Sequence, residues 1–428
     1  MINRKVAAAV LCISVLFAGC TAAVDESTSS SESEDKVTET TDATTESTLP
    51  PYMQHDYVPE GDGYFSLIEE GYGTKIKSQV AGTCWAYAGT TAIESNYKVR
   101  TGEDILLDPI WIVSDVYGSD KEEGFFLNNG ISRLSAGGWG IQTVGALADG
   151  CEGYYLYDAS MFDSTDNEGL KNAVRTYGGL LIAICDNSSA TNYIDNYITV
   201  NVPGSVDDPD YEFDHAVVLV GWDDNFPADY FKTPASQNGA WLAQNSMGGQ
   251  GLYWVSYDSP LAEVLSLSVT TEYSDVSSYD CFCGDMVTAG DTTEIANVFH
   301  QQGTLAAVGF YTVEDGQTIT VEVRDGEFGD VLATVTGTFD FSGYHSIVLP
   351  SAIEVTDYTL VASYDGPAPV EGVSGYEDFV TTLILTSHEG ESFVKIDGQW
   401  HDLSLQETAD LLSAEGILNN CCLKGLYI

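Results

Sequence analysis

The chain has 428 residues, 44% of them hydrophobic and 11% aromatic, which is enough to build the cores of two domains. Fifteen basic residues stand against 65 acidic ones, so the formal net charge is −50. Nucleic-acid binding depends on neutralising phosphates with Lys and Arg, and this charge therefore excludes nucleic acid as a partner. The acidic surplus favours solubility, with selection of basic substrates or calcium binding as the alternative.

Residues 1–20 have the pattern of an export signal. A short positive region at residues 3–5 precedes an apolar run at 6–17 that is shorter than the roughly 20 residues needed to span a bilayer. Small residues and Cys20 follow, and this resembles the bacterial lipoprotein signal, in which the cysteine sulfur receives the lipid. The alternative is an ordinary signal peptide with an incidental cysteine. Both interpretations place the mature chain outside the cell, and the resemblance implies a lipid anchor at Cys20 in the bacterial cell membrane.

Residues 21–55 are dominated by Ser, Thr, Asp and Glu, so we expect a disordered acidic tether. The globular part begins near residue 56. Its pattern is α+β, because a helix-rich part precedes a strand-rich part, and we assign it to residues 56–272. The predicted helix and strands are residues 84–98, 180–184, 216–220 and 253–257.

The pattern changes after about residue 272. Ile319, Val321 and Val323 alternate with polar residues, and turn residues recur at short intervals. Short alternating strands with regular turns are typical of an antiparallel β-sandwich, which we predict for residues 273–428.

Cys84 is a candidate nucleophile. A free thiol has a pKa of about 8.5, and the N-terminus of a helix lowers it because unpaired N–H groups favour an anion. Cys84 follows Ala81-Gly82-Thr83 and opens a helical pattern, with Thr83 as the expected cap. The alternative for a single cysteine here is a buried packing role.

A histidine and an asparagine could complete the site. His215 leads directly into an apolar strand, which would hold a base firmly. Asn245 follows a second apolar stretch, and its side-chain oxygen could orient the imidazole ring of His215 toward the thiolate. Taken singly, His215 could be a structural histidine and Asn245 a turn residue. The order Cys, His, Asn is more specific than any one of them.

These segments resemble the motifs of the papain-like cysteine peptidases. The resemblance covers roughly residues 60–270 and rests on four segments in the family's order. The segments are Gln79-Val80-Ala81-Gly82-Thr83-Cys84-Trp85-Ala86-Tyr87, Gly137-Gly138-Trp139, Asp214-His215-Ala216-Val217, and Asn245-Ser246-Met247-Gly248 followed by Gly251-Leu252-Tyr253-Trp254.

The resemblance implies a role for each residue. Cys84 would attack the scissile carbonyl, His215 would share its proton, and Asn245 would orient His215. The Gln79 side chain and the Cys84 backbone N–H would form the oxyanion hole. Gly137 and Gly138 would hydrogen-bond the substrate backbone, or form a simple tight turn.

The sequence departs from the family pattern at three places in the site, one of which is the shortened segment after Asn245 that lacks the family's second tryptophan. Gln79 lies five residues before Cys84, where the family usually has six. Met247 replaces the tryptophan that normally covers the His–Asn pair. Methionine is apolar and can exclude water there, although it is less rigid.

The C-terminal part resembles the lectin-like β-domain that some secreted bacterial papain-like peptidases carry. We therefore expect an extracellular cysteine endopeptidase that acts on a protein or peptide and needs no cofactor or metal. A glycan or a surface protein is the partner expected for the lectin-like domain. The alternative function is a surface adhesin with an inactive peptidase domain.

Six further cysteines remain in the mature chain after Cys20 and Cys84 are set aside. Two lie near the start of the β-domain and two near its end, so a disulfide joining its ends is one hypothesis. A metal site is the alternative, although the spacing is not that of a zinc ribbon. The six are Cys151, Cys185, Cys281, Cys283, Cys421 and Cys422.

Overall fold

The structure is a computed structural model. It describes residues 59, 61–116, 140–186, 191–193, 198–208, 210–248, 251–372, 387–414 and 416–428. The predicted signal and tether, with Cys20, lie outside the described residues, as do Gly137 and Gly138. Within the described ranges, no helix is long and apolar enough to cross a membrane.

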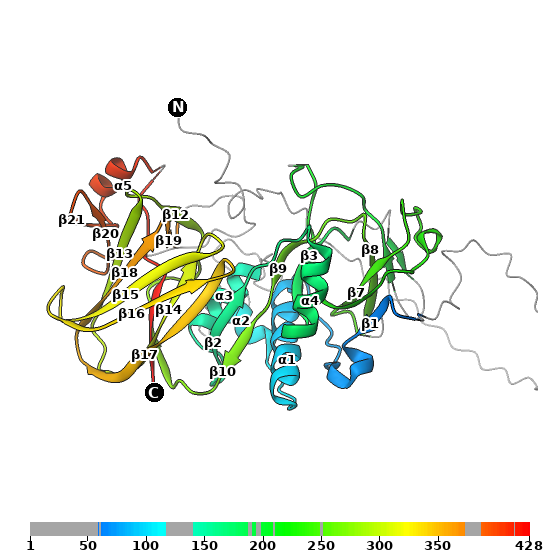
Figure 1. The fold of residues 1–428 in the computed structure, drawn as a ribbon, viewed down its shortest axis with the longest axis horizontal. Coiled ribbons are helices and arrows are strands. Elements are labelled where there is room, and N and C mark those ends of the chain that lie inside the picture. Colours follow the sequence, from blue (N-terminus) through cyan, green and yellow to red (C-terminus); the bar gives the residue numbers. More distant parts are fainter. Residues whose placement is uncertain are drawn as a thin grey trace, which may run out of the picture.

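Helices gather in the first part of the chain, as the sequence predicts (Figure 1). The longest is α1, which begins at Cys84 and ends where the backbone N–H of Gly102, in a left-handed conformation, bonds to the Lys98 carbonyl. Its first half is almost completely buried, because small residues let the neighbouring elements approach closely. The helices here are η2 (Ile68–Tyr72), α1 (Cys84–Thr101), α2 (Pro109–Val116), α3 (Gly140–Ala148), α4 (Asn167–Tyr177) and η4 (Ala228–Tyr230).

The first part also contains an eight-stranded sheet in the order β4-β5-β8-β7-β6-β3-β9, with β1 also paired to β6. All of its pairs are antiparallel except β5 with β8. The strands expected at 180–184, 216–220 and 253–257 are confirmed as β3, β6 and most of β8. The bounds are β1 (Tyr64–Ser66), β3 (Leu180–Ile184), β4 (Thr191–Tyr193), β5 (Ile198–Val200), β6 (His215–Asp223), β7 (Ala240–Gln244), β8 (Leu252–Ser256) and β9 (Ala262–Leu265).

The C-terminal part is an antiparallel β-sandwich, as predicted. One six-stranded sheet has the order β10-β2-β17-β14-β22-β11 and the other β16-β15-β18-β13-β20-β21. Their shared core combines Val308 and Leu423 of the first sheet with Ile295 and Val321 of the second. The bounds are β2 (Tyr155–Ser160), β10 (Ser268–Thr270), β11 (Asp275–Ser277), β12 (Asp285–Val287), β13 (Thr292–Phe299), β14 (Gly303–Thr312), β15 (Gln317–Asp325), β16 (Val331–Phe339), β17 (Gly343–Val355), β18 (Tyr358–Asp365), β19 (Ala368–Val370), β20 (Ser392–Ile396), β21 (Gln399–Asp402), α5 (Gln406–Leu412) and β22 (Leu423–Tyr427).

The two parts share a sheet. Strands β2 and β10 come from the first part, yet β2 pairs with β17 of the sandwich, so hydrogen bonding runs across the domain boundary expected at residues 272 and 273. Figure 1 shows both strands between α1 and the sandwich. The first part also packs closely through α3, where a Cβ at Gly145 would lie 1.8 Å from the Cys281 carbonyl oxygen. Any side chain at position 145 would collide with this oxygen, so only glycine is possible there.

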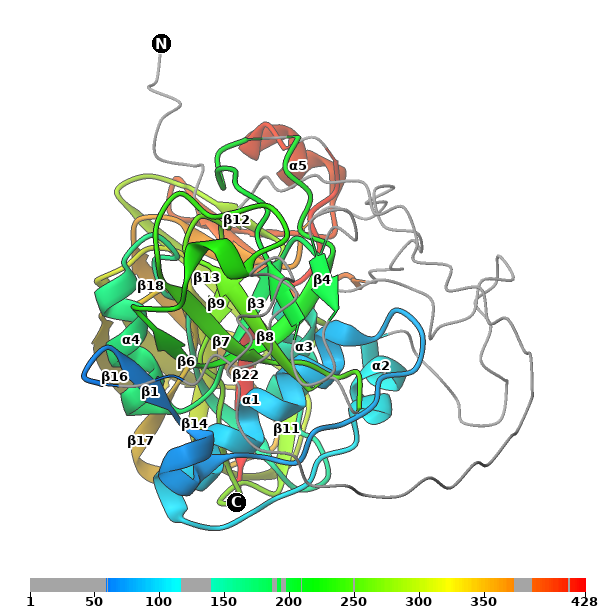
Figure 2. The same cartoon turned by 90° about the vertical axis from the view of Figure 1, so that its right-hand side faces the viewer.

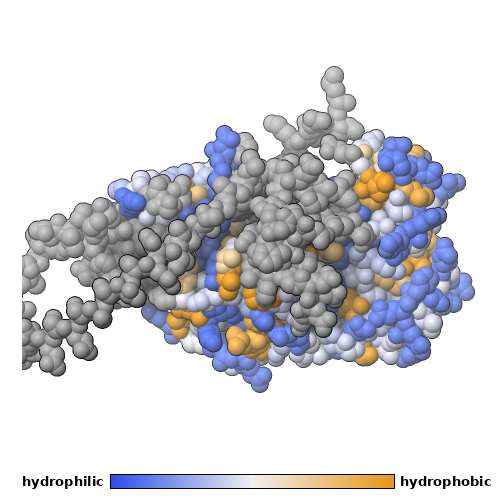
Figure 3. Space-filling model, turned by 180° about the vertical axis from the view of Figure 1, so that it is seen from behind, coloured by the Kyte–Doolittle hydropathy of each residue, from blue (hydrophilic) through white to orange (hydrophobic). Residues whose placement is uncertain are grey.

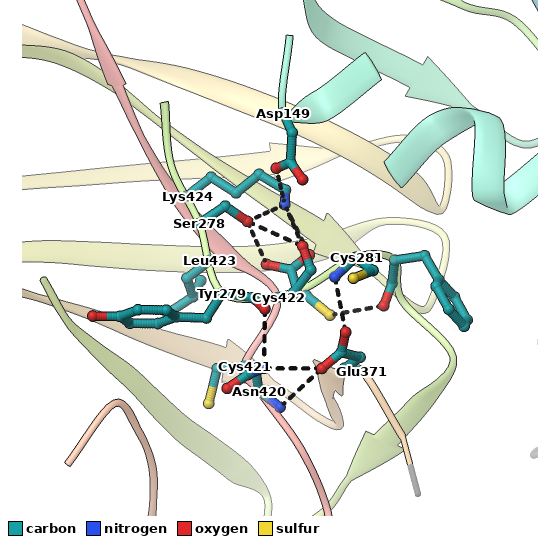
Figure 4. Close-up of polar contacts among 12 residues, drawn as sticks. Asp149, Ser278, Tyr279, Cys281, Glu371, Asn420, Cys421, Cys422, Leu423 and Lys424 are labelled. Carbon is teal, nitrogen blue, oxygen red and sulfur yellow. Dashed lines mark hydrogen bonds and ion pairs between the residues drawn. The ribbon is translucent and has the colours of Figure 1, made fainter. Parts of the chain in front are cut away.

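A buried ion cluster also joins the two parts (Figure 4). Lys424 on β22 is fully buried, and its ammonium lies 2.7 Å from the Asp149 carboxylate, directly after α3. The same ammonium lies 3.0 Å from the fully buried carboxylate of Asp280 and donates to Ser278. Because a buried charge requires partners, this cluster ties the last strand of the chain to α3.

The face of the molecule turned toward the viewer in Figure 3 is mixed in character. Hydrophilic residues dominate its coloured part, and hydrophobic residues are scattered among them. Scattered apolar side chains are ordinary on protein surfaces and do not mark an interface.

Candidate active site

Cys84 is the first residue of α1, and its side chain is partly exposed beside the fully buried Trp85. The Thr83 carbonyl accepts the first backbone hydrogen bonds of the helix, from Ala86 and Tyr87. The expectation that Thr83 caps the helix with its side chain is wrong. Its hydroxyl donates instead to the Val80 carbonyl at 2.7 Å, because the preceding loop folds back tightly over it.

His215 and Asn245 come from neighbouring strands of the eight-stranded sheet. His215 is the first residue of β6, and Asn245 directly follows the last residue of β7. These strands are antiparallel, so the start of one meets the end of the other. His215 Nε2 donates to Asn245 Oδ1 at 2.8 Å. The Nδ1 atom is therefore the ring nitrogen left for Cys84.

The thiol and the imidazole shift each other's pKa in opposite directions. Burial of the Cys84 thiol acts to raise its pKa, but the hydrogen bond and the charge of His215 outweigh burial and lower it. Burial acts to lower the pKa of His215, yet the hydrogen bond to Cys84 and the negative charges of Cys84 and Asp186 raise it to about 9. At neutral pH these shifts favour a thiolate paired with an imidazolium.

Gln79 lies between the nucleophile loop and the loop after β7. Its Oε1 accepts from Ser246 Oγ at 2.6 Å, and its Nε2 donates to the Ala81 carbonyl at 2.8 Å. A primary amide has two N–H donors, so a second one remains for a ligand. Ala81 itself has φ +55°, a left-handed conformation that is unusual for a residue with a Cβ. The loop between Gln79 and Cys84 is one residue shorter than the family pattern, and the left-handed turn at Ala81 lies within it.

Tyr253 contributes to the cover over the His–Asn pair. Its ring centroid lies 6.0 Å from that of His215, and its hydroxyl donates to Asp186 at 2.6 Å. The hydroxyl also lies 3.9 Å from the Met247 sulfur. Met247 is 47% exposed, so it shields the pair only partly. A tyrosine from β8 and a methionine thus occupy the region where the family has tryptophan.

Sequence reasoning missed three residues of this site. Ser246 and Tyr253 stood inside recognised segments, but nothing indicated that they would contact Gln79 and His215. Asp186 follows strand β3 by two positions and carried no signal at all. Gly137 and Gly138, expected to bind substrate backbone, lie outside the described residues, and α3 begins two positions after them.

The C-terminal part of the chain matches a known domain family. Residues 278–425 match the family model described as the lectin-like domain. Part of the chain is similar in sequence to cathepsin S of Rattus norvegicus, with 26% identity over 200 residues, 42% of this chain and 54% of the relative. Digestive cysteine proteinase 2 of Homarus americanus is 26% identical over 191 residues, 41% of this chain and 54% of the relative. The chain thus spans about half the length of these curated relatives.

The whole arrangement matches solved structures of one clostridial protein. A structure of the cysteine protease Cwp84 after propeptide cleavage superposes with a TM-score of 0.69 at 19% identity, covering 85% of this chain and 98% of that one. A structure of the cysteine protease and lectin-like domains of Cwp84, a surface-layer-associated protein of Clostridium difficile, has the same TM-score and identity, with 86% and 89% covered. The chain therefore has a papain-like cysteine protease fold followed by a lectin-like domain, as the sequence predicts.

Proposed function

We propose that this chain is an extracellular cysteine endopeptidase in which Cys84 is the nucleophile and His215 its proton partner. The observation that carries the proposal is the hydrogen bond from His215 Nε2 to Asn245 Oδ1, at 2.8 Å, beside a thiol whose pKa His215 lowers. This geometry matches the requirement for a nucleophile, a base and a group that orients the base. A packing cysteine would not need such partners.

The mechanism follows from the positions of these groups. The Cys84 thiolate attacks the scissile carbonyl carbon, and the oxyanion receives N–H donors from the Cys84 backbone and the Gln79 side chain. The His215 imidazolium gives its proton to the leaving amine, and a thioester remains on Cys84. Neutral His215 then takes a proton from water, which attacks the thioester and releases the carboxylic acid product and the thiol. Gly137 and Gly138 are proposed to hold the substrate backbone.

Labelling with an epoxide inhibitor of papain-like enzymes tests the nucleophile. We expect a single adduct on Cys84, lost in Cys84→Ala and retained in Cys281→Ala, which removes an exposed thiol outside the site. Hydrolysis of a mixed peptide library should follow the same pattern. A folded wild-type chain that neither reacts nor hydrolyses any peptide would refute the proposal and favour the adhesin with an inactive peptidase domain.

The location outside the cell is supported by the predicted export signal and by the surface-layer association of the clostridial structural neighbour. We propose that Cys20 carries the lipid that holds the chain at the membrane. Metabolic labelling with palmitate should mark the wild-type chain and not Cys20→Ala, which should be released to the medium. A wild-type chain that is exported but unlabelled would contradict the anchor while leaving the peptidase proposal intact.

A further inference from the structure

A cavity of about 500 Å³ opens at the junction of the protease fold and the lectin-like domain. Its walls come from the last turns of α1 and α4, from β2 and β10, and from the end of β16, the segment after it and the start of β17. Figure 2 shows α4 on the same side of the molecule as β16 and β17. The volume lies within the range of about 300–1,000 Å³ that is usual for small-ligand sites.

We propose that this cavity binds one uncharged saccharide unit of a surface or cell-wall glycan. Four aromatic residues line it, each of them partly exposed, so their rings are accessible to a ligand. The C–H groups of a sugar ring carry partial positive charge and pack against the negative face of an aromatic ring. The four residues are Tyr157, Tyr177, Phe339 and Phe341.

Two of these rings are held in place by packing. The ring of Phe339 stacks on buried His345 at a centroid distance of 4.5 Å, and the ring of Phe341 lies 4.9 Å from that of Phe162. A wall that is already ordered loses little conformational entropy when a ligand binds. The cavity is therefore a preformed site.

The cavity also contains a buried acceptor without a partner. Asn96 is 3% exposed, and its Nδ2 donates to the Tyr177 carbonyl at 2.8 Å, while its Oδ1 receives no hydrogen bond from the residues that the structure describes. An unsatisfied buried acceptor destabilises the protein, and a ligand hydroxyl could remove that cost by donating to Oδ1. This atom favours a ligand rich in hydroxyl groups.

A carboxylate is fixed in the same cavity. Asp158 Oδ1 accepts from Ser160 Oγ at 2.9 Å, and its Oδ2 lies 2.9 Å from Nδ1 of His345. Nε2 of His345 is within 3.0 Å of the Phe341 carbonyl oxygen, so the ring is held at both nitrogens. A carboxylate fixed in this way still has lone pairs that can accept from sugar hydroxyls.

The charges in the cavity favour an uncharged ligand. Asp158 and exposed Asp340 would repel an anionic sugar or a phosphate. Arg100 would repel a basic peptide side chain. The guanidinium of Arg100 already donates to the Val269 carbonyl and lies 5.2 Å from the ring centroid of Tyr157, which fixes its charge at the wall.

The cavity is separate from the candidate active site. Asn96 and Arg100 follow Cys84 by 12 and 16 positions along α1. At 1.5 Å per residue this is about 18–24 Å, so one chain could hold a glycan while Cys84 attacks a peptide. This inference goes beyond the proposed peptidase function, and neither depends on the other.

The chain offers a matched pair of variants for the test. Thr338 and Thr336 are both exposed on β16, and each pairs its hydroxyl with a threonine of β15 at 2.9 Å. Thr338 lines the cavity, whereas Thr336 is not among the lining residues. Thr338→Arg should therefore block the cavity, and Thr336→Arg adds the same charge to the same strand outside it.

The experiment is saturation-transfer NMR and calorimetric titration of the full chain. The probes are maltose, lactose, cellobiose and the β-1,4-linked N-acetylglucosamine disaccharide. We expect at least one of them to bind, at least tenfold more weakly in Thr338→Arg and within about twofold of wild type in Thr336→Arg. Absence of binding by all four, or equal weakening by both variants, would overturn the inference. Epoxide labelling of Cys84 in the same samples reports separately on the peptidase site.

Discussion

The Gln79 side-chain oxygen accepts a hydrogen bond from the Ser246 hydroxyl at 2.6 Å, across 167 positions of sequence. Two backbone hydrogen bonds also join these loops. The Gln79 N–H donates to the Ser246 carbonyl at 2.7 Å, and the Gly248 N–H donates to the Lys77 carbonyl. The loop that carries Gln79, the proposed oxyanion donor, is thereby attached to the loop that carries Asn245. Both loops must hold their positions if Gln79 is to serve the proposed reaction.

Ser246→Ala should reduce the rate without unfolding the chain. A neutral hydrogen bond contributes about 0.5–1.5 kcal/mol, so the loss of orientation at Gln79 should lower kcat/KM by about three- to tenfold. Steady-state kinetics on a fluorogenic peptide would measure it. Ser266→Ala is the matched control, since that buried hydroxyl has no hydrogen-bond partner within the described part of the chain, and it should leave the rate unchanged. Equal rates in both variants would contradict a role for the Gln79–Ser246 bond.

The kcat/KM for hydrolysis of a fluorogenic peptide should follow a bell-shaped pH profile, because Cys84 must be ionised to attack and His215 must be protonated to give its proton to the leaving amine. The reactive pair needs Cys84 ionised, which its lowered pKa favours, and His215 protonated, which holds up to its pKa of about 9. The alkaline limb should therefore lie near pH 9, since the pair is lost when His215 gives up its proton. A limb at the ordinary histidine value of about 6.5 would contradict the pair.

Asn245→Ala should move that alkaline limb to lower pH, because the hydrogen bond to Asn245 helps to raise the pKa of His215. Hydrogen bonds to charged groups contribute about 1.5–3 kcal/mol, so kcat/KM should fall by about 10- to 100-fold. Asn201→Ala removes a different buried amide, which holds the Thr233 carbonyl, and it should keep the wild-type profile. A lower rate with an unmoved limb would show that Asn245 acts in some other way.

Lys424→Met should destabilise the whole chain. It leaves the fully buried carboxylate of Asp280 without its ion-pair partner, and removing one partner of a buried pair typically costs about 3–5 kcal/mol. Urea denaturation followed by tryptophan fluorescence would measure the free energy of unfolding. Lys395→Met, which breaks a partly exposed pair with Glu294, should change it by less than about 1 kcal/mol. Similar losses in the two variants would contradict the importance of the buried cluster.

A disulfide in the exported protein should join Cys283 to Cys422. The structure has both as thiols, and the nearby Cys283 thiol adds to burial in raising the pKa of Cys422. The Cys421 thiol instead donates to the Phe393 carbonyl at 3.4 Å, on a different side of the chain. Peptide mapping after alkylation without reduction should recover a linked pair that is lost in Cys422→Ala and kept in Cys421→Ala. Full alkylation of both thiols in the wild type would contradict the bridge.

The candidate site could be recognised from sequence because each of its parts depends on local structure. A cysteine at the start of an apolar helix, a histidine opening a strand and an asparagine ending one are short patterns, and their order resembles one family. The residue types alone also indicated the α+β part and the sandwich, since helical and strand periodicities differ. The roles of Cys84, His215, Asn245 and Gln79 stay predictions until the kinetics are measured.

Only the tertiary structure could place side chains that are far apart in the sequence. Ser246 reaches Gln79 because two loops pair across the sheet, and Lys424 reaches Asp149 because the last strand packs beside α3. The cavity at the junction likewise has walls from both parts of the chain, and β2 leaves the protease fold to join a sheet of the sandwich. Composition and periodicity determine which elements form and which faces they bury. Which elements meet depends on packing across the whole chain, and no local pattern encodes it.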